Sequence, residues 1–391
     1  MKLPINYSVK NPEKKSLKLE TLAIKNAKDQ YNKLHPVSAP IYLSSTYERS
    51  EDGSYAEGFV YGRHDNPNRR MLEKNIATLE NGAVCHSFGS GMAAVSAVFQ
   101  SLKMGDHVLL PDDVYFNIQT LIEGVFRRWG LEHTKVNMSD LQAVSSAIQS
   151  NTALIWIETP SNPQLKISDI RALSTLAKAK NILVAVDNTW PTPILQTPLN
   201  LGANIVVHST TKYFGGHSDV LGGCVVFKEK DEHAERIKLI QTHGGGIPAP
   251  FDCWLIARGI QTLHLRVTKQ TENAQKLADW LVEHPRIHRV LYPGLKYHPN
   301  HQIAAQQMHG GFGAMLSVLI DGDETQTVKV STQLQLFTTA TSLGGVESLI
   351  EHRKSVEGPS SQTPANLLRI SIGIENIADL ISDWEQALMV I

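Results

Sequence analysis

The chain has little of what membrane-spanning, nucleic-acid-binding and disulfide-stabilised proteins need. It contains no run of 18 apolar residues, so we expect no membrane span. The 37 basic and 38 acidic residues leave a formal net charge of −1, which gives no electrostatic reason to expect nucleic acid or an anionic membrane as a partner. The 3 cysteines, Cys85, Cys224 and Cys253, are widely spaced and form neither a disulfide framework nor a metal-binding pattern.

Two further absences bear on location and metal binding. The first 22 residues lack an apolar h-region, so we expect no secretory signal, and the few cysteines suit a reducing cytoplasm best. The 16 histidines are scattered without an HExxH pattern, so we expect no metal site. What the chain does have is length and apolar content: 391 residues, 42% of them hydrophobic, are enough for two or three domains with an ample core.

A repeated alternation of strand and helix patterns begins near residue 83. Short apolar runs occur at 83–86, 107–110, 154–157, 182–186, 204–208 and 224–227, and helical spacing occurs at 93–102, 118–129 and 168–179. Repeated units of this kind predict an α/β fold with a largely parallel sheet covered by helices.

The two ends of the chain differ from this middle part. Residues 1–60 show little periodicity beyond a strand-like piece at 41–43, and an arm of this kind often packs on a neighbouring subunit. Residues 231–285 are mostly helical in pattern. Later strand patterns occur at 289–292, 314–320 and 367–372, and helical patterns at 325–334 and 376–389. We therefore predict an N-terminal arm over 1–60, a large domain over 61–255 and an α+β domain over 256–391.

The most informative segment surrounds Lys212. It follows the apolar run 205–207 and opens into a loop of hydroxyls and glycines, in which Ser209 and Thr211 precede the lysine by three positions and by one. Such strand ends are where α/β proteins keep their chemistry. Desolvation lowers the pKa of a lysine, and the neutral amine forms Schiff bases with aldehydes such as pyridoxal 5'-phosphate (PLP). Taken alone, the segment suits equally a PLP site, with both hydroxyls on the phosphate, and a surface lysine in a polar loop.

A second segment favours the PLP interpretation. The apolar run 182–186 predicts a buried parallel strand, and it ends in Asp187. A carboxylate at this end of a strand points into the ligand crevice, and beside the pyridine nitrogen of PLP it keeps that nitrogen protonated. The 25 positions from Asp187 to Lys212 leave room for one short crossover between neighbouring strands. The alternative role for Asp187 is that of a turn or helix-capping residue.

Further residues suit the phosphate, the ring and a substrate carboxylate. The Gly-rich segment 88–92 lies between a strand and an Ala-rich helix, where backbone N–H groups can meet a phosphate, and it matches neither GxGxxG nor a Walker sequence. Tyr115, just past a strand, is placed either to stack on the pyridine ring or to pack on a core edge. Arg369 lies inside an apolar strand, where it needs an anion, either a substrate α-carboxylate or a structural partner.

Eight short motifs follow one another along the chain in an order that is specific in combination. They are Tyr61-Gly62-Arg63 with Asn66-Pro67, Ser90-Gly91-Met92, Asp112-Asp113-Val114-Tyr115, Glu158-Thr159-Pro160-Ser161-Asn162-Pro163, Val186-Asp187-Asn188-Thr189, Ser209-Thr210-Thr211-Lys212, Ser342-Leu343-Gly344-Gly345 and Arg369-Ile370-Ser371-Ile372-Gly373. With these motifs the chain, from about residue 36 to its end, resembles the Cys/Met-metabolism family of PLP-dependent enzymes, the trans-sulfuration group that includes cystathionine β-lyase, γ-lyase and γ-synthase and methionine γ-lyase.

The resemblance implies a fold-type I PLP enzyme that acts on a small amino-acid substrate as a homotetramer of two tight dimers with shared active sites. It implies three catalytic residues: Lys212, which binds the cofactor covalently and moves protons, Tyr115, which stacks on the ring, and Tyr61. The other cofactor-binding residues that it implies are Asp187, Ser90, Gly91, Met92, Ser209, Thr211, Thr189 and, with Tyr61 from the neighbouring subunit, Arg63. The substrate-binding residues that it implies are Arg369, Ser342 and Asn162.

Three departures from the family pattern lie near the expected substrate entrance. Phe116-Asn117-Ile118 stands where the family often has Gly-Gly-Thr, Thr341 stands where many γ-synthases and γ-lyases have a glutamate, and the segment 354–359 stands where many members have Thr-His-Ala. These changes leave the cofactor chemistry intact and bear on the choice of substrate. The absence of a glutamate at position 341 favours a lyase over a synthase.

We therefore predict a carbon–sulfur lyase that acts on L-cystathionine or a related sulfur amino acid by β- or γ-elimination. The products are pyruvate or 2-oxobutanoate, with ammonia and a thiol amino acid. The alternatives are cystathionine γ-synthase, which joins an activated homoserine to cysteine, and methionine γ-lyase; a non-catalytic PLP-binding protein is a distant third. A hydrolase with Cys85 and His86 as a dyad is disfavoured, because adjacent side chains on a strand point to opposite faces.

Overall fold

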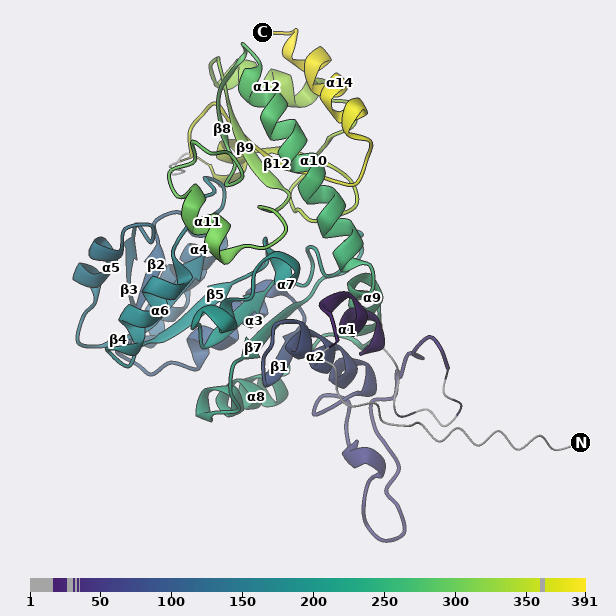
Figure 1. The fold of residues 1–391 in the computed structure, drawn as a ribbon. Coiled ribbons are helices and arrows are strands. Elements are labelled where there is room, and N and C mark those ends of the chain that lie inside the picture. The colour runs from purple at the N-terminus through teal and green to yellow at the C-terminus, as the bar shows by residue number, and fades with distance from the viewer. Residues whose placement is uncertain (1–16, 27–30, 32–33, 35, 359–362) are drawn as a thin grey trace, which may run out of the picture.

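The computed structural model describes residues 17–26, 31, 34, 36–358 and 363–391, and two sheets organise it (Figure 1). The larger sheet has the strand order β1-β7-β6-β5-β4-β2-β3. Its strands are Val84–Phe88 (β1), His107–Pro111 (β2), Glu132–Val136 (β3), Thr152–Glu158 (β4), Leu183–Asp187 (β5), Ile205–His208 (β6) and Gly223–Phe227 (β7). Strand β7 runs against both of its neighbours and the other pairings are parallel, so the predicted α/β fold with a mostly parallel sheet is confirmed.

Helices cover both faces of this sheet because its central strands are apolar on both sides. Strand β4 shows the alternation: Trp156 faces a core shared with α3 (Gly91–Gln100), α4 (Phe116–Gly124) and α8 (Glu232–Gly244). Ile155 faces the opposite core. The helices on that side are α2 (Pro67–Leu79), α6 (Ile170–Lys178), α7 (Thr192–Leu195) and α9 (Pro250–Ile260). Helices α1 (Leu19–Lys25) and α5 (Leu141–Ala147) each contribute one buried residue to that core, Ala23 and Val144.

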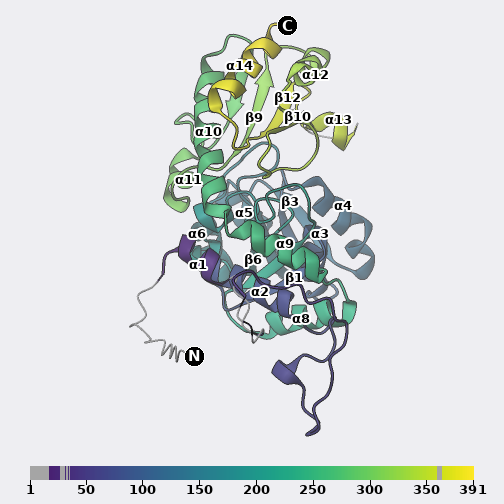
Figure 2. The same cartoon turned by 90° about the vertical axis from the view of Figure 1, so that its right-hand side faces the viewer.

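The second sheet lies beyond the carboxyl ends of the large sheet's parallel strands (Figure 1). Its order is β10-β11-β12-β9-β8, with bounds Ile287–Leu291 (β8), Met315–Ile320 (β9), Thr338–Thr339 (β10), Leu349–His352 (β11) and Leu367–Ser371 (β12). The remaining helices are α10 (Leu263–Glu283), α11 (His301–Gln307), α12 (Glu324–Gln333), α13 (Arg353–Glu357) and α14 (Ile377–Leu388). Helices α10, α12 and α14 pack on the second sheet (Figure 2). Helix α13 contacts β12 of the same sheet. The domain boundary that we predict between residues 255 and 256 falls inside α9.

One predicted strand is absent from the structure, and several of its elements were not predicted, β3 and α5 among them. No strand forms at 41–43, because the backbone of Tyr42 is hydrogen bonded to the side chains of Asn66 and Asn68 instead of to a strand. Strand β3 and helix α5 have no counterpart among the predicted elements. β3 is an edge strand whose side chains are partly exposed, so it lacks the apolar run of a buried strand.

A loop that contains two isolated β-bridges projects from the body of the molecule. Residues 46–61 form it, with bridges between Thr46 and Tyr61 and between Arg49 and Tyr55, and both views show it away from the sheets (Figures 1 and 2). It belongs to the predicted arm over 1–60, of which residues 1–16, 27–30, 32–33 and 35 lie outside the described residues. Within the described part of the chain, no helix is long and apolar enough to cross a membrane.

The placement of β4 at the centre of the large sheet predicts the effect of a cavity there. Ile155→Ala removes a fully buried side chain between β2 and β5 and should lower the free energy of unfolding by about 2–5 kcal/mol. Leu141→Ala, at an exposed position of α5, should change it by no more than about 0.5 kcal/mol. Urea unfolding followed by circular dichroism measures both. Equal midpoints for the two variants would contradict this placement of β4.

Candidate active site

A cavity of about 220 Å³ lies where the second sheet covers the carboxyl ends of the large sheet's strands. Residues that follow β2, β4, β5 and β6 line it from below, together with the N-terminus of α3, and Ser342 and Arg369 line it from the second sheet's side. All the predicted site residues line this cavity except Tyr61 and Arg63. The topology therefore brings together side chains from four separate strand ends and from a second sheet.

Lys212 lies in the turn that follows β6, and its amine points at the second sheet's side of the cavity. Its Nζ donates a hydrogen bond of 2.8 Å to the hydroxyl of Ser342. Burial, and next the positive charge of Arg369, lower the pKa of Lys212 to about 8. Ser342 itself has a φ of 95°, a backbone conformation that non-glycine residues rarely adopt and that tends to occur at functional sites. A sizeable fraction of the amine is therefore neutral near physiological pH, in contrast to an exposed lysine.

Asp187 ends β5 and points to the same face of the sheet as Ala185, toward α3. Burial raises the pKa of its carboxyl group, and hydrogen bonds from Thr189 oppose that rise. Oδ1 of Asp187 accepts the backbone N–H of Thr189 at 3.0 Å, and the Thr189 hydroxyl accepts the backbone N–H of Ser209 at 2.9 Å. These bonds tie the ends of β5 and β6 together beneath the cavity. A buried carboxylate placed there is stabilised by a cation.

Glu158 is a cavity residue to which sequence reasoning gave no role. It ends β4 directly beside Asp187 in the sheet register. Burial, and next the negative charge of Asp187, raise the pKa of Glu158 well above its ordinary value, which favours the protonated carboxyl group. Its Oε2 accepts the backbone N–H of Tyr115 at 2.9 Å. This bond fixes the position of Tyr115, which follows β2 and lines the cavity. Its position at the end of an apolar strand, in the same edge as Asp187, was the available signal.

The Gly-rich segment after β1 forms a cradle at the N-terminus of α3. The Ser90 hydroxyl caps the helix by accepting the N–H of Ala93 at 3.1 Å, so the N–H groups of Gly91 and Met92 are left for an anion. A Cβ on Gly91 would lie only 2.8 Å from the Cβ of Ser209, so only glycine allows this close approach. The hydroxyl of Thr211, also in the cavity wall, is hydrogen bonded to the backbone of Gly222.

These features fit PLP. The helix N-terminus and the glycine cradle suit a phosphate, and the buried Asp187 carboxylate suits the protonated pyridine nitrogen as its missing cation. The amine of Lys212, with its lowered pKa, suits the aldehyde. Tyr115 lies in the wall between them, and its hydroxyl accepts a hydrogen bond of 2.8 Å from Asn117, one of the residues that departs from the family pattern.

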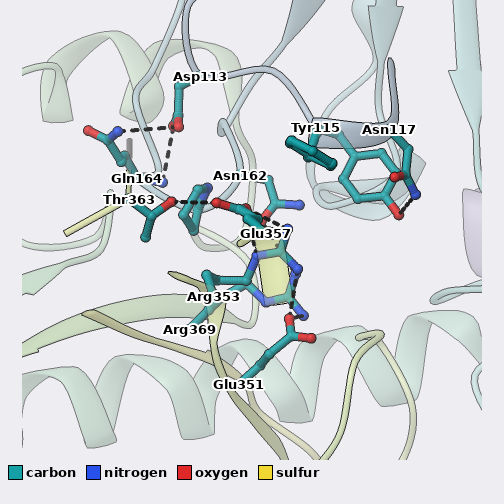
Figure 3. Close-up of polar contacts among 12 residues, drawn as sticks. Asp113, Tyr115, Asn117, Asn162, Gln164, Glu351, Arg353, Glu357, Thr363 and Arg369 are labelled. Atoms are coloured by element: carbon teal, nitrogen blue, oxygen red, sulfur yellow. Dashed lines mark hydrogen bonds and ion pairs between the residues drawn. The ribbon is translucent and has the colours of Figure 1, made fainter. Parts of the chain in front are cut away.

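Arg369 lies on β12 and is buried in the opposite wall. Burial lowers its pKa to about 10, against the opposing effect of Glu351. Its Nη2 lies 2.7 Å from Glu351 Oε2 and donates to the Ser342 carbonyl at 3.0 Å, and its Nη1 donates to Asn162 Oδ1 at 3.4 Å (Figure 3). Both anion roles considered for Arg369 therefore have support: it has a structural partner in Glu351, and it still lines the cavity.

Arg353 is the second cavity residue that sequence reasoning missed. It begins α13, and most of α13 belongs to the segment 354–359 that departs from the family pattern; Pro359 lies outside the described residues. Although burial opposes it, hydrogen bonds and charges of Glu351 and Glu357 raise the pKa of Arg353 above its ordinary value. The signal was weak, because nothing in the sequence shows that this position faces the cavity.

Asp113, from the motif before Tyr115, has a structural position. It accepts hydrogen bonds from the Ser161 hydroxyl and, at 3.1 Å, from the backbone N–H of Gln164 (Figure 3). Burial raises its pKa to about 6, and the hydrogen bonds from Ser161 and Gln164 act against that rise. These bonds hold the loop that carries Asn162 to the cavity.

Tyr61 and Arg63 lie outside the cavity of their own chain. Tyr61 stands at the base of the projecting loop with 42% of its surface exposed, and Arg63 Nη1 donates to the Thr242 carbonyl at 2.6 Å. The Arg63 guanidinium lies 5.6 Å from the centre of the Tyr61 ring. That both residues reach the cofactor of a neighbouring subunit stays a prediction.

The lowered pKa of Lys212 predicts how the cofactor-free protein captures PLP. Only the neutral amine attacks the aldehyde, so the capture rate should rise about tenfold per pH unit up to pH 8 and level off above it, instead of rising to pH 10.5. Stopped-flow absorbance between pH 6 and 10 measures the rate, and Lys212→Ala should show no covalent capture. A rate still rising steeply at pH 9.5 would contradict the burial of this amine.

Comparisons with known proteins identify the family of this chain. The family model described as "Cys/Met metabolism PLP-dependent enzyme" matches residues 20–389. Cystathionine gamma-synthase of Mycobacterium tuberculosis (strain ATCC 25618 / H37Rv) is 47% identical over 358 residues, 90% of this chain and 92% of that protein. Cystathionine beta-lyase of Coxiella burnetii is 44% identical over 367 residues, with 90% and 93% covered. The crystal structure of cystathionine gamma-lyase from Lactobacillus plantarum, complexed with L-serine, has a TM-score of 0.89 at 39% identity, with 95% and 99% covered. The chain therefore belongs to the Cys/Met-metabolism family of PLP-dependent enzymes.

Proposed function

We propose that this enzyme is a carbon–sulfur lyase that cleaves L-cystathionine or a related sulfur amino acid by elimination. The observation that carries the proposal is the neutral side chain of Thr341, which lines the cavity beside Ser342. A carboxylate at this position would hold the ammonium group of the incoming amino acid in the cavity after the activating group of the homoserine has left. Without that charge, the cavity has less hold on an incoming nucleophile, which favours elimination over replacement.

The names of the relatives do not choose between these reactions. A synthase and a β-lyase are 47% and 44% identical to this chain, and a γ-lyase has a closely similar structure. Enzymes with all three names thus resemble this chain over nearly its whole length. The choice must come from the side chains that surround the leaving group, of which Thr341 is one.

The residues of the cavity divide the work of an elimination. Arg369 binds the α-carboxylate and so orients the substrate, which is a large part of the catalytic effect. PLP, when bound, supplies an electron sink for the negative charge that forms at Cα. Asp187 keeps the pyridine nitrogen protonated for this purpose, and Lys212, neutral above about pH 8, accepts the proton from Cα.

The atoms of the proposed reaction balance with one water. In a β-elimination the bond between sulfur and Cβ breaks, the thiolate takes up a proton, and water completes the products homocysteine, pyruvate and ammonia. In a γ-elimination the bond between sulfur and Cγ breaks, Lys212 moves a second proton, and the products are cysteine, 2-oxobutanoate and ammonia. Both routes use the same base and the same carboxylate-binding arginine.

We further propose a homotetramer with shared active sites, located in the cytoplasm. The position of Tyr61 and Arg63 outside their own cavity, at the base of a projecting loop, supports the sharing of sites. The three cysteines are free and buried, which suits a reducing compartment.

A product assay with L-cystathionine tests the proposed reaction. The purified, PLP-loaded protein should release pyruvate or 2-oxobutanoate, and the one that forms identifies the bond that breaks. Formation of cystathionine from an activated homoserine and cysteine, with neither oxo acid released from cystathionine, would show that the protein is a synthase and that the proposal is wrong.

Substitution of Thr341 tests the observation behind the proposal. Thr341→Glu should raise the ratio of replacement to elimination by at least about tenfold, because one charged hydrogen bond to an incoming amino acid contributes about 1.5–3 kcal/mol. Thr339→Glu adds the same charge at an exposed position of β10 and should leave the ratio unchanged. Chromatography of the products, with an activated homoserine and cysteine both present, measures the ratio. An equal ratio in the two variants would show that position 341 does not determine the reaction type.

A further inference from the structure

A row of alternating charges runs from the cavity wall into α13. Arg369 of β12, Glu351 of β11 and Arg353 and Glu357 of α13 follow one another in this row, and Figure 3 shows the four side chains grouped beside Asn162. Their side chains expose 4%, 5%, 4% and 9% of their surface, so water hardly screens the charges. Both arginines line the cavity. The row therefore connects the departing segment of the sequence with the residue that we assign to the substrate carboxylate.

Glu351 stands between the two arginines and contacts both with one oxygen. It lies directly opposite Arg369 in the register of β11 and β12. Its Oε2 is 2.7 Å from Arg369 Nη2 and 2.8 Å from Arg353 Nη1. Its Oε1 is buried and has no hydrogen-bond partner among the residues that the structure describes. Among the described residues, the ion pairs of Glu351 are therefore those with Arg369 and Arg353.

A fixed carboxylate this close to Arg369 competes with a substrate carboxylate for the same positive charge. Were Arg369 the sole partner of Glu351, the pair would be neutral and its attraction for a second anion would be weak. Arg353 prevents full neutralisation of Arg369, because Glu351 forms an ion pair with Arg353 as well. The strength with which Arg353 contacts Glu351 therefore sets how much charge Arg369 presents to the cavity.

Helix α13 fixes the position of Arg353 through Glu357. Nη2 and Nε of Arg353 donate to Glu357 Oε1 at 2.7 and 3.1 Å, one helical turn along the chain. Oε2 of Glu357 accepts the hydroxyl of Thr363 at 2.8 Å, on the far side of the connection to β12. Glu357 thus holds Arg353 in place and also draws its charge away from Glu351.

We propose that Arg353 and Glu357 are positioning residues with opposite effects on substrate binding: Arg353 shares Glu351 and frees Arg369 for the substrate carboxylate, and Glu357 restrains Arg353. This inference rests on the role proposed for Arg369. It assigns a task to the segment in which the chain departs from the family pattern, namely to set the affinity for the amino-acid carboxylate without contact with the reacting atoms.

Single substitutions in α13 separate this role from simple stabilisation. Arg353→Gln should raise KM for L-cystathionine at least about tenfold, the factor that corresponds to about 1.4 kcal/mol of binding free energy, with a much smaller change in kcat. Glu357→Gln should lower KM, because Arg353 then turns more of its charge to Glu351. Lys354→Gln is the matched control on the same helix: Lys354 is partly exposed, 3.5 Å from Glu324, and its loss should change neither constant.

A carboxylate that cannot react keeps the inference independent of the reaction type. The probe is 4-(methylsulfanyl)butanoate, which is methionine without its amino group, titrated into the PLP-loaded protein by calorimetry. Its dissociation constant should rise at least about tenfold in Arg353→Gln and fall in Glu357→Gln. Binding of the probe by a protein that cleaves no sulfur amino acid would refute the proposed function and leave this inference intact.

A charge-matched double variant covers the case in which Arg353→Gln does not fold. Arg353→Gln with Glu357→Gln removes one positive and one negative charge and should still weaken the probe as the single arginine variant does. The opposite signs of the two single variants are the decisive result. If both weaken the probe equally and both lower the unfolding temperature, the row of charges serves stability alone and the inference is wrong.

Discussion

Burial of Lys212 beneath the second sheet is the constraint on which the site depends. An exposed lysine is charged at neutral pH and can neither attack an aldehyde nor accept a proton. The turn after β6 places its amine against Ser342, and burial with Arg369 nearby lowers its pKa to about 8. The second sheet is thus part of the chemistry, because without its cover the large sheet would present a solvated, inert lysine.

The same burial makes acidic side chains costly, and the structure meets that cost in three different ways. Glu158 has a raised pKa, which favours its protonated form, and it accepts a backbone N–H. Asp187 suits the protonated nitrogen of PLP, which would supply the missing positive charge. Glu351 is paired with two arginines on a single oxygen. The first of these positions Tyr115, and on our proposals the second would tune the cofactor and the third would bear on the substrate carboxylate.

The parts that sequence reasoning reached are those with a local signal. Strand β5 is an apolar run that ends in an acid, and β6 is an apolar run before a lysine, so their shared edge followed from the rule for parallel strands. The edge strand β3 gave no such signal, because its side chains are half exposed. Arg353 was missed for another reason: it meets Arg369 only through Glu351, across a strand pairing that no spacing in the sequence reveals.

The distribution of the site over two sheets separates cofactor binding from substrate choice. The residues that suit PLP come from the large sheet and α3, whereas Thr341, Ser342, Arg353 and Arg369 come from the second sheet and its connections. Changes in the second set leave the lysine, the carboxylate and the phosphate cradle in place. Relatives that carry the names of three reactions match this chain over nearly its whole length, and so over both sets of residues. On our proposals, Thr341 in this wall favours elimination, and Arg353 sets the affinity for the substrate carboxylate.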